Sequence, residues 1–126
     1  MTINLSHVAL HLCAGLLLSA LAACSSGNGA APPGSDAASG AALIEKLGCG
    51  SCHTIPGIVD ANGMVGPPLD HMANRQYIAG VLRNTSDDMV QWLRFPQRVV
   101  PGNAMPDLAI SQDDAMKITA YLSTLR

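Results

Sequence analysis

Two cysteines followed by a histidine, Cys49, Cys52 and His53, form the stretch of this sequence with the clearest capacity for chemistry. The spacing Cys-x-x-Cys-His is typical of covalent haem attachment. On one turn of helix the two thiols lie on the same side, where each can add to a vinyl group of one porphyrin. The imidazole then points at the iron as its proximal ligand. The stretch therefore predicts one covalently bound haem c.

A Cys-x-x-Cys pair can also serve in thiol redox chemistry or in zinc binding. A thioredoxin-like redox pair is expected within a βαβ pattern, and no such pattern surrounds the motif. A zinc site needs a second pair of ligands, but the sequence after His53 has no cysteine and a single histidine, His71. Haem attachment is therefore the interpretation that the surrounding sequence favours.

The composition limits what can surround this motif. The chain has 126 residues, enough for one small domain with appendages, and a formal net charge of -2, which excludes a basic nucleic-acid-binding surface. Its large aromatic side chains are one Trp, one Phe and two Tyr, a poor supply for a core. A buried porphyrin would provide the missing apolar bulk.

Residues 1–23 are predicted to be a signal peptide. The apolar run from Leu12 to Ala23 is too short to span the ~30 Å hydrocarbon core of a bilayer. It ends in Leu-Ala-Ala-Cys24, which resembles the lipobox of bacterial lipoproteins. That resemblance implies that the thiol of Cys24 receives a diacylglyceryl group and becomes the mature N-terminus. An uncleaved anchor, or a signal peptide cut near Ala23, remains open because no Lys or Arg precedes the run.

Residues 24–38 are predicted to be a flexible tether from the lipid. They consist almost entirely of Ser, Gly, Ala, Asn and Pro, which cannot bury an apolar face. About 14 such residues have a root-mean-square span of roughly 20 Å. The following domain is therefore expected close to the periplasmic side of a bacterial membrane.

Residues 39–126 are predicted to be an all-α domain. Apolar residues recur at helical spacing over 39–48, with Ser39 as a plausible N-cap, so this helix should run into the haem motif. The sequence from Ser111 to Asp114 resembles a capping box, and behind it lies one apolar stripe of Ala115, Ile118, Leu122 and Leu125. Thr85 to Asp88 opens a short helix, whose inner face holds Met89, Trp92 and Leu93.

Met105 is the candidate for the distal iron ligand. It lies on an expected loop, where Pro106 restricts its backbone and Pro101-Gly102 provides a turn. His71 is the rival candidate, for a bis-histidine site. The remaining methionines of the domain are expected to fill the core: Met64, Met72, Met89 and Met116.

From residue 40 to 126 the sequence resembles class I monohaem cytochromes c. It is similar in particular to the haem c domain at the C-terminal end of subunit II of haem–copper cytochrome c oxidases. The matching motifs are Cys49–Gly57, Val65–Leu69, Arg75, Ala79–Leu82, Asn84–Thr85, Trp92–Leu93, Pro96–Gln97, Pro101–Asn103, Met105–Pro106 and Ala120–Leu122. In those oxidase subunits a copper-binding domain and a transmembrane hairpin precede the haem domain, whereas here a lipobox and tether occupy that place.

The resemblance implies further contacts with the haem. The carbonyl of Pro67 would accept the Nδ1 proton of His53 and Leu69 would pack on the porphyrin. Arg75 would face a propionate, with a solvated arginine as the alternative. Trp92 would lie next to the distal ligand, with plain core packing as the alternative, and Asn103 would belong to the haem-binding loop.

The resemblance also implies how the terminal helices of the domain pack. The first and last helices of class I cytochromes c cross in van der Waals contact. Gly40 would provide the close approach, with Ile44, Ile118 and Tyr121 around it.

The function implied is single-electron transfer by a His53- and Met105-ligated haem in a respiratory chain, without enzymatic activity. The expected partners are a redox donor and acceptor, such as a membrane-bound oxidase or reductase, together with the membrane itself. The alternatives are a fixed electron-relay subunit of a membrane oxidase or dehydrogenase, and a small haem enzyme in which Met105 leaves the iron. Lys46 and Lys117 are the only lysines, so docking is not expected to use a lysine-rich surface.

Overall fold

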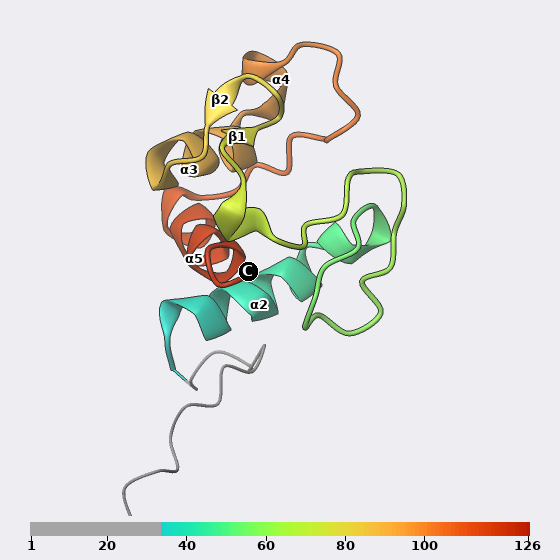
Figure 1. Cartoon of the computed structure of the whole chain (residues 1–126), viewed down its shortest axis with the longest axis vertical. Helices are drawn as coiled ribbons and strands as arrows, with labels where there is room; N and C mark the ends of the chain where they lie inside the picture. Colours follow the sequence, from blue (N-terminus) through green and yellow to red (C-terminus); the bar gives the residue numbers. More distant parts are fainter. Residues whose placement is uncertain (1–33) are drawn as a thin grey trace, which may run out of the picture.

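A computed structural model describes residues 34–126 of the chain (Figure 1). The predicted signal peptide, Cys24 and most of the predicted tether lie outside these residues. The described elements, in order, are α2 (Asp36–Lys46), η1 (Cys49–Ser51), η2 (Met72–Asn74), β1 (Tyr77–Ile78), β2 (Leu82–Arg83), α3 (Ser86–Arg94), α4 (Pro96–Val99) and α5 (Gln112–Leu122). Among them, no helix is long and apolar enough to span a membrane.

The first described helix begins earlier than the sequence predicted. Its N-cap is Ser35, whose hydroxyl accepts a hydrogen bond from the backbone N–H of Ala38 at 3.2 Å. Ser39, the predicted cap, lies inside the helix, and residues 36–38 form its first turn and do not belong to a flexible tether. The sequence offers two serines as caps, and the alanines between them favour helix, so that the earlier cap is used.

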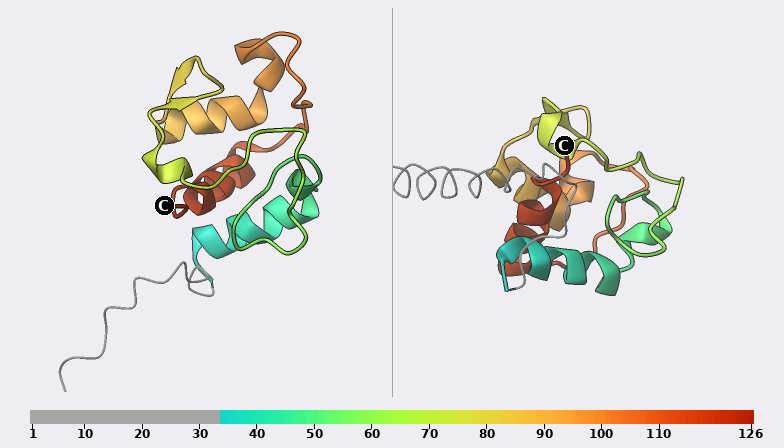
Figure 2. Two further views of the ribbon diagram at one scale, coloured as in Figure 1. Left: turned by 45° about the vertical axis from the view of Figure 1, so that its right-hand side comes forward. Right: turned by 60° about the horizontal axis from the view of Figure 1, so that its bottom comes forward.

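The two long helices at the ends of the domain, α2 and α5, cross in close contact (Figures 1 and 2). A Cβ added to Gly40 would collide with the backbone carbonyl of Lys117, so only glycine permits this approach. Ile44 of α2 and Ile118 of α5 belong to the same buried core and are each 1% exposed. The predicted helix crossing and the role of Gly40 are therefore confirmed.

The last helix follows its predicted pattern. Ser111 is its N-cap and accepts a hydrogen bond from the backbone N–H of Asp114 at 3.1 Å. The apolar stripe is buried along its whole length, at Ala115, Ile118, Leu122 and Leu125. This face forms the centre of the core.

The predicted short helix is α3, which packs on α5. Thr85 caps it by accepting a hydrogen bond from the backbone N–H of Asp88 at 3.2 Å. Met89 and Leu93 are buried on its inner face, and Trp92 is half-buried. α3 ends at Arg94, before Pro96, because a proline cannot continue a helix. Pro96 is instead the first residue of the single-turn helix α4.

A small β-hairpin was not predicted. Strands β1 and β2 pair antiparallel, with Tyr77 opposite Arg83 and Ile78 opposite Leu82. The turn between them contains Ala79 and Gly80 at positive φ, 51° and 74°. Two-residue strands are too short to produce a visible alternation of apolar and polar residues, so the sequence did not reveal them. The fold is otherwise the predicted one, several short helices with long connecting loops.

Candidate functional site

A cavity of about 460 Å³ lies beside the crossing of α2 and α5. This volume falls within the range of roughly 300–1,000 Å³ that is usual for ligand and cofactor sites. All nine residues predicted to bind the cofactor line it: Cys49, Cys52, His53, Pro67, Leu69, Arg75, Trp92, Asn103 and Met105. Residues more than 50 positions apart in the sequence therefore converge on one space that is large enough for a cofactor.

The two cysteines lie at one side of this cavity. η1 is a 3₁₀ turn, in which the backbone N–H of Cys52 donates to the carbonyl of Cys49 at 3.3 Å. The backbone N–H of His53 donates to the same carbonyl at 3.0 Å. Cys49 and Cys52 are half-buried and free, without a disulfide between them. The short turn brings both thiols to the same wall of the cavity, as covalent attachment to one porphyrin requires.

The environment of the first thiol differs from that of a redox-active cysteine. Burial raises the pKa of Cys49, a hydrogen bond from the backbone partly opposes this, and the neighbouring Cys52 adds to the rise. Reactive Cys-x-x-Cys pairs need a lowered thiol pKa. Within residues 34–126, no group of three or more His, Cys, Asp or Glu side chains could hold a metal ion, so a zinc site also has no support there.

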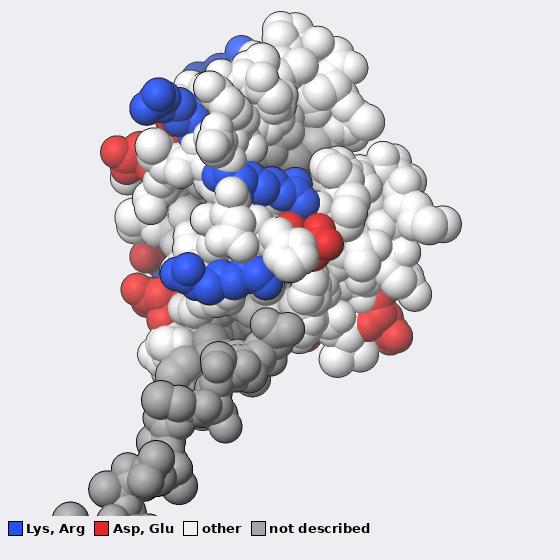
Figure 3. Space-filling view, in the orientation of Figure 1, with Lys and Arg blue, Asp and Glu red and all other residues white. Residues whose placement is uncertain are grey.

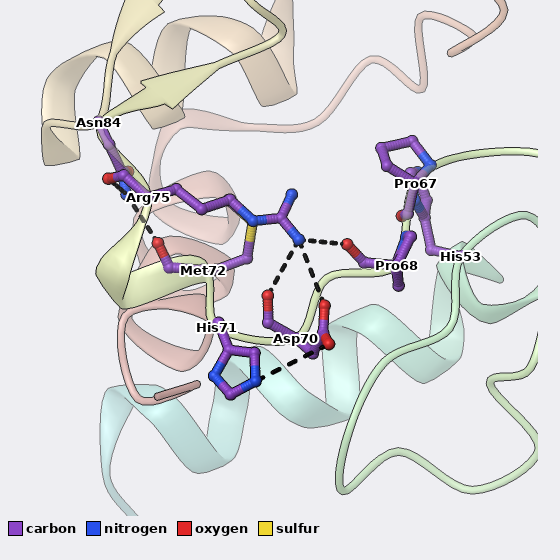
Figure 4. Close-up of polar contacts among 8 residues, drawn as sticks. All are labelled: His53, Pro67, Pro68, Asp70, His71, Met72, Arg75 and Asn84. Atoms are coloured by element: carbon purple, nitrogen blue, oxygen red, sulfur yellow. Dashed lines mark hydrogen bonds and ion pairs between the residues drawn. The ribbon is translucent and has the colours of Figure 1, made fainter.

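The proximal histidine is held through one ring nitrogen. His53 Nδ1 donates to the carbonyl oxygen of Pro67 at 2.7 Å (Figure 4). This bond leaves Nε2 as the ring nitrogen available to a metal. Gly66 makes the approach possible, because a Cβ there would lie 2.6 Å from His53 Nδ1. The backbone N–H of Gly66 also donates to the carbonyl of Cys52 at 2.8 Å, which fixes the loop against the cysteine turn.

Arg75 reaches this same loop. Its Nη2 donates to the carbonyls of Pro68, at 2.5 Å, and Asp70, at 3.0 Å, and lies 3.4 Å from the carboxylate of Asp70 (Figure 4). The arginine therefore has protein partners and is not a freely solvated side chain. It also lines the cavity, where its contact with a propionate stays a prediction.

The candidate distal ligand lies in the loop that follows α4. Met105 is half-buried and lines the cavity, as Trp92 of α3 and Leu69 do. The backbone N–H of Met105 donates to Asn103 Oδ1 at 2.7 Å, and its carbonyl accepts from Gln97 Nε2 at 2.8 Å. Gln97 belongs to one of the matching motifs, but the sequence predicts no functional role for it, because a glutamine gives no signal until the loop folds back on it.

The rival ligand and the other methionines differ in position. His71 is exposed and does not line the cavity, and its Nε2 lies 4.0 Å from the carboxylate of Asp70. Met72 and Met89 are buried, as predicted. The prediction is wrong for Met64, which is 91% exposed, and for Met116, which is 49% exposed. Met64 is in a loop and Met116 is on the outer face of α5, so neither has a neighbouring element to cover it.

The comparison with protein families matches residues 37–126 to the sequence model named Cytochrome c. This chain belongs to the cytochrome c family. The chain is 33% identical over 88 residues to cytochrome c oxidase subunit 2 of Alkalihalophilus pseudofirmus. It is 30% identical over 91 residues to cytochrome c oxidase subunit 2 of Bacillus sp. strain PS3. Each alignment covers 69% of this chain and 25% of the relative, so the chain spans about a quarter of the length of these curated relatives. No solved structure matches it.

These findings identify the cofactor and agree with the resemblance found in the sequence. The chain is a class I cytochrome c, similar to the haem domain of oxidase subunit II, and carries covalently attached haem c. The cavity fits that group: it has the cysteine pair on one wall, a histidine with Nδ1 already occupied, and largely apolar surroundings. Haem-based electron transfer is the activity of this family.

Proposed function

We propose that this cytochrome c carries single electrons in a bacterial respiratory chain and is not an enzyme. The observation that supports this most strongly is the convergence of His53 and Met105 on one cavity from distant parts of the chain. In this proposal the histidine Nε2 and the methionine sulfur would both bind the haem iron, which would leave no position on the iron for a substrate. Cys49 and Cys52 provide the thioether bonds.

The haem supplies the one-electron chemistry when it is bound. The residues of the chain set how readily it accepts the electron. A histidine and a thioether as ligands raise the potential by favouring ferrous iron. The Pro67 carbonyl accepts a hydrogen bond from the imidazole Nδ1–H, which fixes the tautomer of His53 and increases the basicity of Nε2. Leu69 and Trp92 give the cavity apolar walls that exclude water.

We propose that redox partners dock at the mouth of this cavity through a surface that is apolar and nearly uncharged. Between Lys46 and Asp70 the only charged residue is Asp60, and between Arg98 and Asp107 there is none. Figure 3 shows one side of the molecule with few acidic or basic residues. A surface of this kind would bind its partner through complementary shape and apolar contacts, and not through charge pairs. A small interface of this kind releases its partner quickly.

Three exposed apolar residues mark this surface: Val59, Met64 and Val65, which are 77%, 91% and 74% exposed. The loop that carries them is tied to the cysteine turn, because the backbone N–H of Gly63 donates to the carbonyl of Gly50 at 3.0 Å. They are therefore presented next to the site of haem attachment.

We also propose that Cys24 is lipidated and holds the domain on the periplasmic side of the membrane. The support is the lipobox-like sequence that ends at Cys24 and the tether-like composition after it. The relatives are subunits of cytochrome c oxidase, which supports a membrane-bound respiratory complex, an oxidase or a reductase, as donor or acceptor.

The experiment that tests this function follows reduction of the ferric holoprotein by membranes supplied with a respiratory substrate. Val65→Glu should slow reduction several-fold, by more than the small fall in reduction potential that a carboxylate at the cavity wall would cause, so the potential is measured alongside the rate. Met116→Glu is the control, since Met116 is also exposed but lies on α5, outside the cavity lining. Equal rates for the wild type and Val65→Glu would contradict the docking surface, and the absence of any reduction by membranes would contradict the respiratory role.

A fixed electron-relay subunit of a membrane oxidase or dehydrogenase is the second candidate, because the relatives are named as oxidase subunits. It would use the same haem and ligands but would stay in its complex. Solubilisation in a mild detergent distinguishes the two: a relay subunit co-purifies with the complex in a constant ratio, whereas a shuttle separates from it.

A further inference from the structure

The backbone of Met105 is held on both sides by side-chain amides. Its N–H donates to Asn103 Oδ1 at 2.7 Å, and its carbonyl accepts from Gln97 Nε2 at 2.8 Å. Residues 101–111 form no helix or strand, so this loop lacks the backbone hydrogen bonds of a regular element. Side chains therefore satisfy the backbone groups at the position that presents the thioether.

The amide of Gln97 contacts the loop at three points. Besides Met105, its Nε2 donates to the carbonyl of Asn103 at 2.9 Å, and its Oε1 accepts from the backbone N–H of Gly102 at 3.1 Å. A primary amide has two N–H donors and one carbonyl acceptor, and all are used here. Gln97 is on α4, so these bonds fasten the loop to a helix.

The amide of Asn103 connects the same two parts from inside the loop. Its Nδ2 donates to the carbonyls of Pro96, at 2.9 Å, and Val100, at 2.6 Å, while its Oδ1 accepts from Met105. Pro96 is one of the most deeply buried side chains of the described region and gives the arrangement a rigid base. The two amides thus form a closed network around the loop.

We propose that Gln97 and Asn103 form an amide clamp that positions Met105 and limits the opening of its loop, so that other ligands rarely replace the methionine on the iron. This rests on the proposed role of Met105 as distal ligand. A thioether sulfur is a weak ligand for ferric iron, so Met105 stays bound only if the loop holds it next to the iron. Each hydrogen bond that must break before the loop opens lowers the population of the open form.

The test measures how fast imidazole binds to the ferric holoprotein, because binding requires Met105 to leave. Gln97→Leu removes all three contacts of the side chain, and Gln97→Glu keeps the acceptor for Gly102 but removes both donors. Both variants should bind imidazole about tenfold faster than the wild type or more, as expected for the loss of three hydrogen bonds in Gln97→Leu and two in Gln97→Glu. Gln91→Leu, at an exposed glutamine of α3, is the control and should stay within about twofold of the wild type.

Amide hydrogen exchange in the ferrous protein separates the clamp from a general loss of stability. Gln97→Leu should speed exchange at the N–H groups of Gly102 and Met105 and leave that of Ile118, in the core helix α5, unchanged. Faster exchange at all three would mean that the glutamine only stabilises the fold, and it would contradict the clamp. Because Gln97 is exposed, its variants should fold and retain haem.

The outcome also distinguishes this inference from the ligand assignment on which it rests. Wild-type imidazole-binding rates in both Gln97 variants would overturn the clamp, even if Met105→Ala removes the spectroscopic signature of thioether ligation. If that signature survives Met105→Ala, the ligand assignment itself fails.

Discussion

At the scale of single residues, Tyr121 connects the last helix to the loop after the cysteine turn. Its hydroxyl donates to the carbonyl of Pro56 at 2.6 Å, across 65 positions of sequence. Burial, and to a smaller extent the carboxylate of Glu45, raise the pKa of Tyr121 above the usual value of about 10 for a tyrosine. The folded state therefore keeps the phenol proton at a pH where the unfolded chain loses it.

Tyr121→Phe should lower the free energy of unfolding by about 1 kcal/mol at neutral pH, the usual net value of one hydrogen bond. The contribution from the raised pKa is fully present below about pH 10 and is lost as the pH rises through the folded-state pKa, so wild-type stability should fall more steeply there than that of the variant. Denaturant titrations from pH 7 to 11 measure both effects.

Tyr77→Phe is the matched control for this experiment, because Tyr77 is 57% exposed in the hairpin. Lys117 also has a raised pKa, chiefly from its hydrogen bond to Asp113, and titrates in both proteins alike. Parallel alkaline slopes for the wild type and Tyr121→Phe would contradict the assigned role of the phenol.

The residues that attach the haem and hold His53 were the part of the site that the sequence predicted best. The cysteine–histidine spacing is local, and so is the Gly-Pro loop, whose carbonyl lies 2.7 Å from His53 Nδ1 as the resemblance implied. Gln97 could not be found in this way, because its partners lie five to eight residues further along a loop with no regular structure. The exposure of Met64 was missed for a similar reason: its residue type suggested core, but the path of the loop determines its position.

At the scale of elements, Gly40→Ala at the crossing of α2 and α5 should change the stability of the protein through two opposing effects. Gly40→Ala should gain about 1 kcal/mol from helix propensity. The added methyl group would also collide with the Lys117 carbonyl, and forcing the helices apart should cost about 1–3 kcal/mol or more. The collision is with backbone and cannot be relieved by a side-chain rotation, so net destabilisation is expected in thermal unfolding of the holoprotein.

Ala42→Gly provides the comparison for this prediction, since Ala42 is exposed on the same helix. It should cost about 1 kcal/mol from propensity alone. A Gly40→Ala protein more stable than the wild type would contradict the predicted collision of the new methyl group with the Lys117 carbonyl.

Sequence periodicity predicted the helices but not their limits. The buried stripe of α5 repeats every three to four residues and is visible without a structure. The start of α2 was misplaced because Ser35 and Ser39 are both suitable caps, and Ala37 and Ala38 add no periodic signal. The hairpin was missed because its strands of two residues each are held by pairing and by the turn at Ala79 and Gly80, not by a pattern of their own.

At the scale of the whole molecule, the proposal joins a haem domain to a lipid through a tether. Cys24→Ser should move the protein from the membrane fraction to a form without lipid, which is soluble if another peptidase cleaves the signal. Fractionation and a mass spectrum of the mature N-terminus measure this. Ser25→Ala is the control and should stay in the membrane. A native N-terminus other than lipid-modified Cys24 would contradict the anchor.

The central claim is that covalently attached haem is ligated by His53 and Met105. The most direct measurement is the absorption spectrum of the ferric holoprotein, in which thioether ligation gives a weak charge-transfer band near the red end of the visible spectrum in cytochromes of this class. Met105→Ala should remove the band and lower the potential, with haem still bound through Cys49 and Cys52 after denaturation. His71→Ala should leave the spectrum unchanged. A band that survives Met105→Ala, or disappears with His71→Ala, would contradict the account.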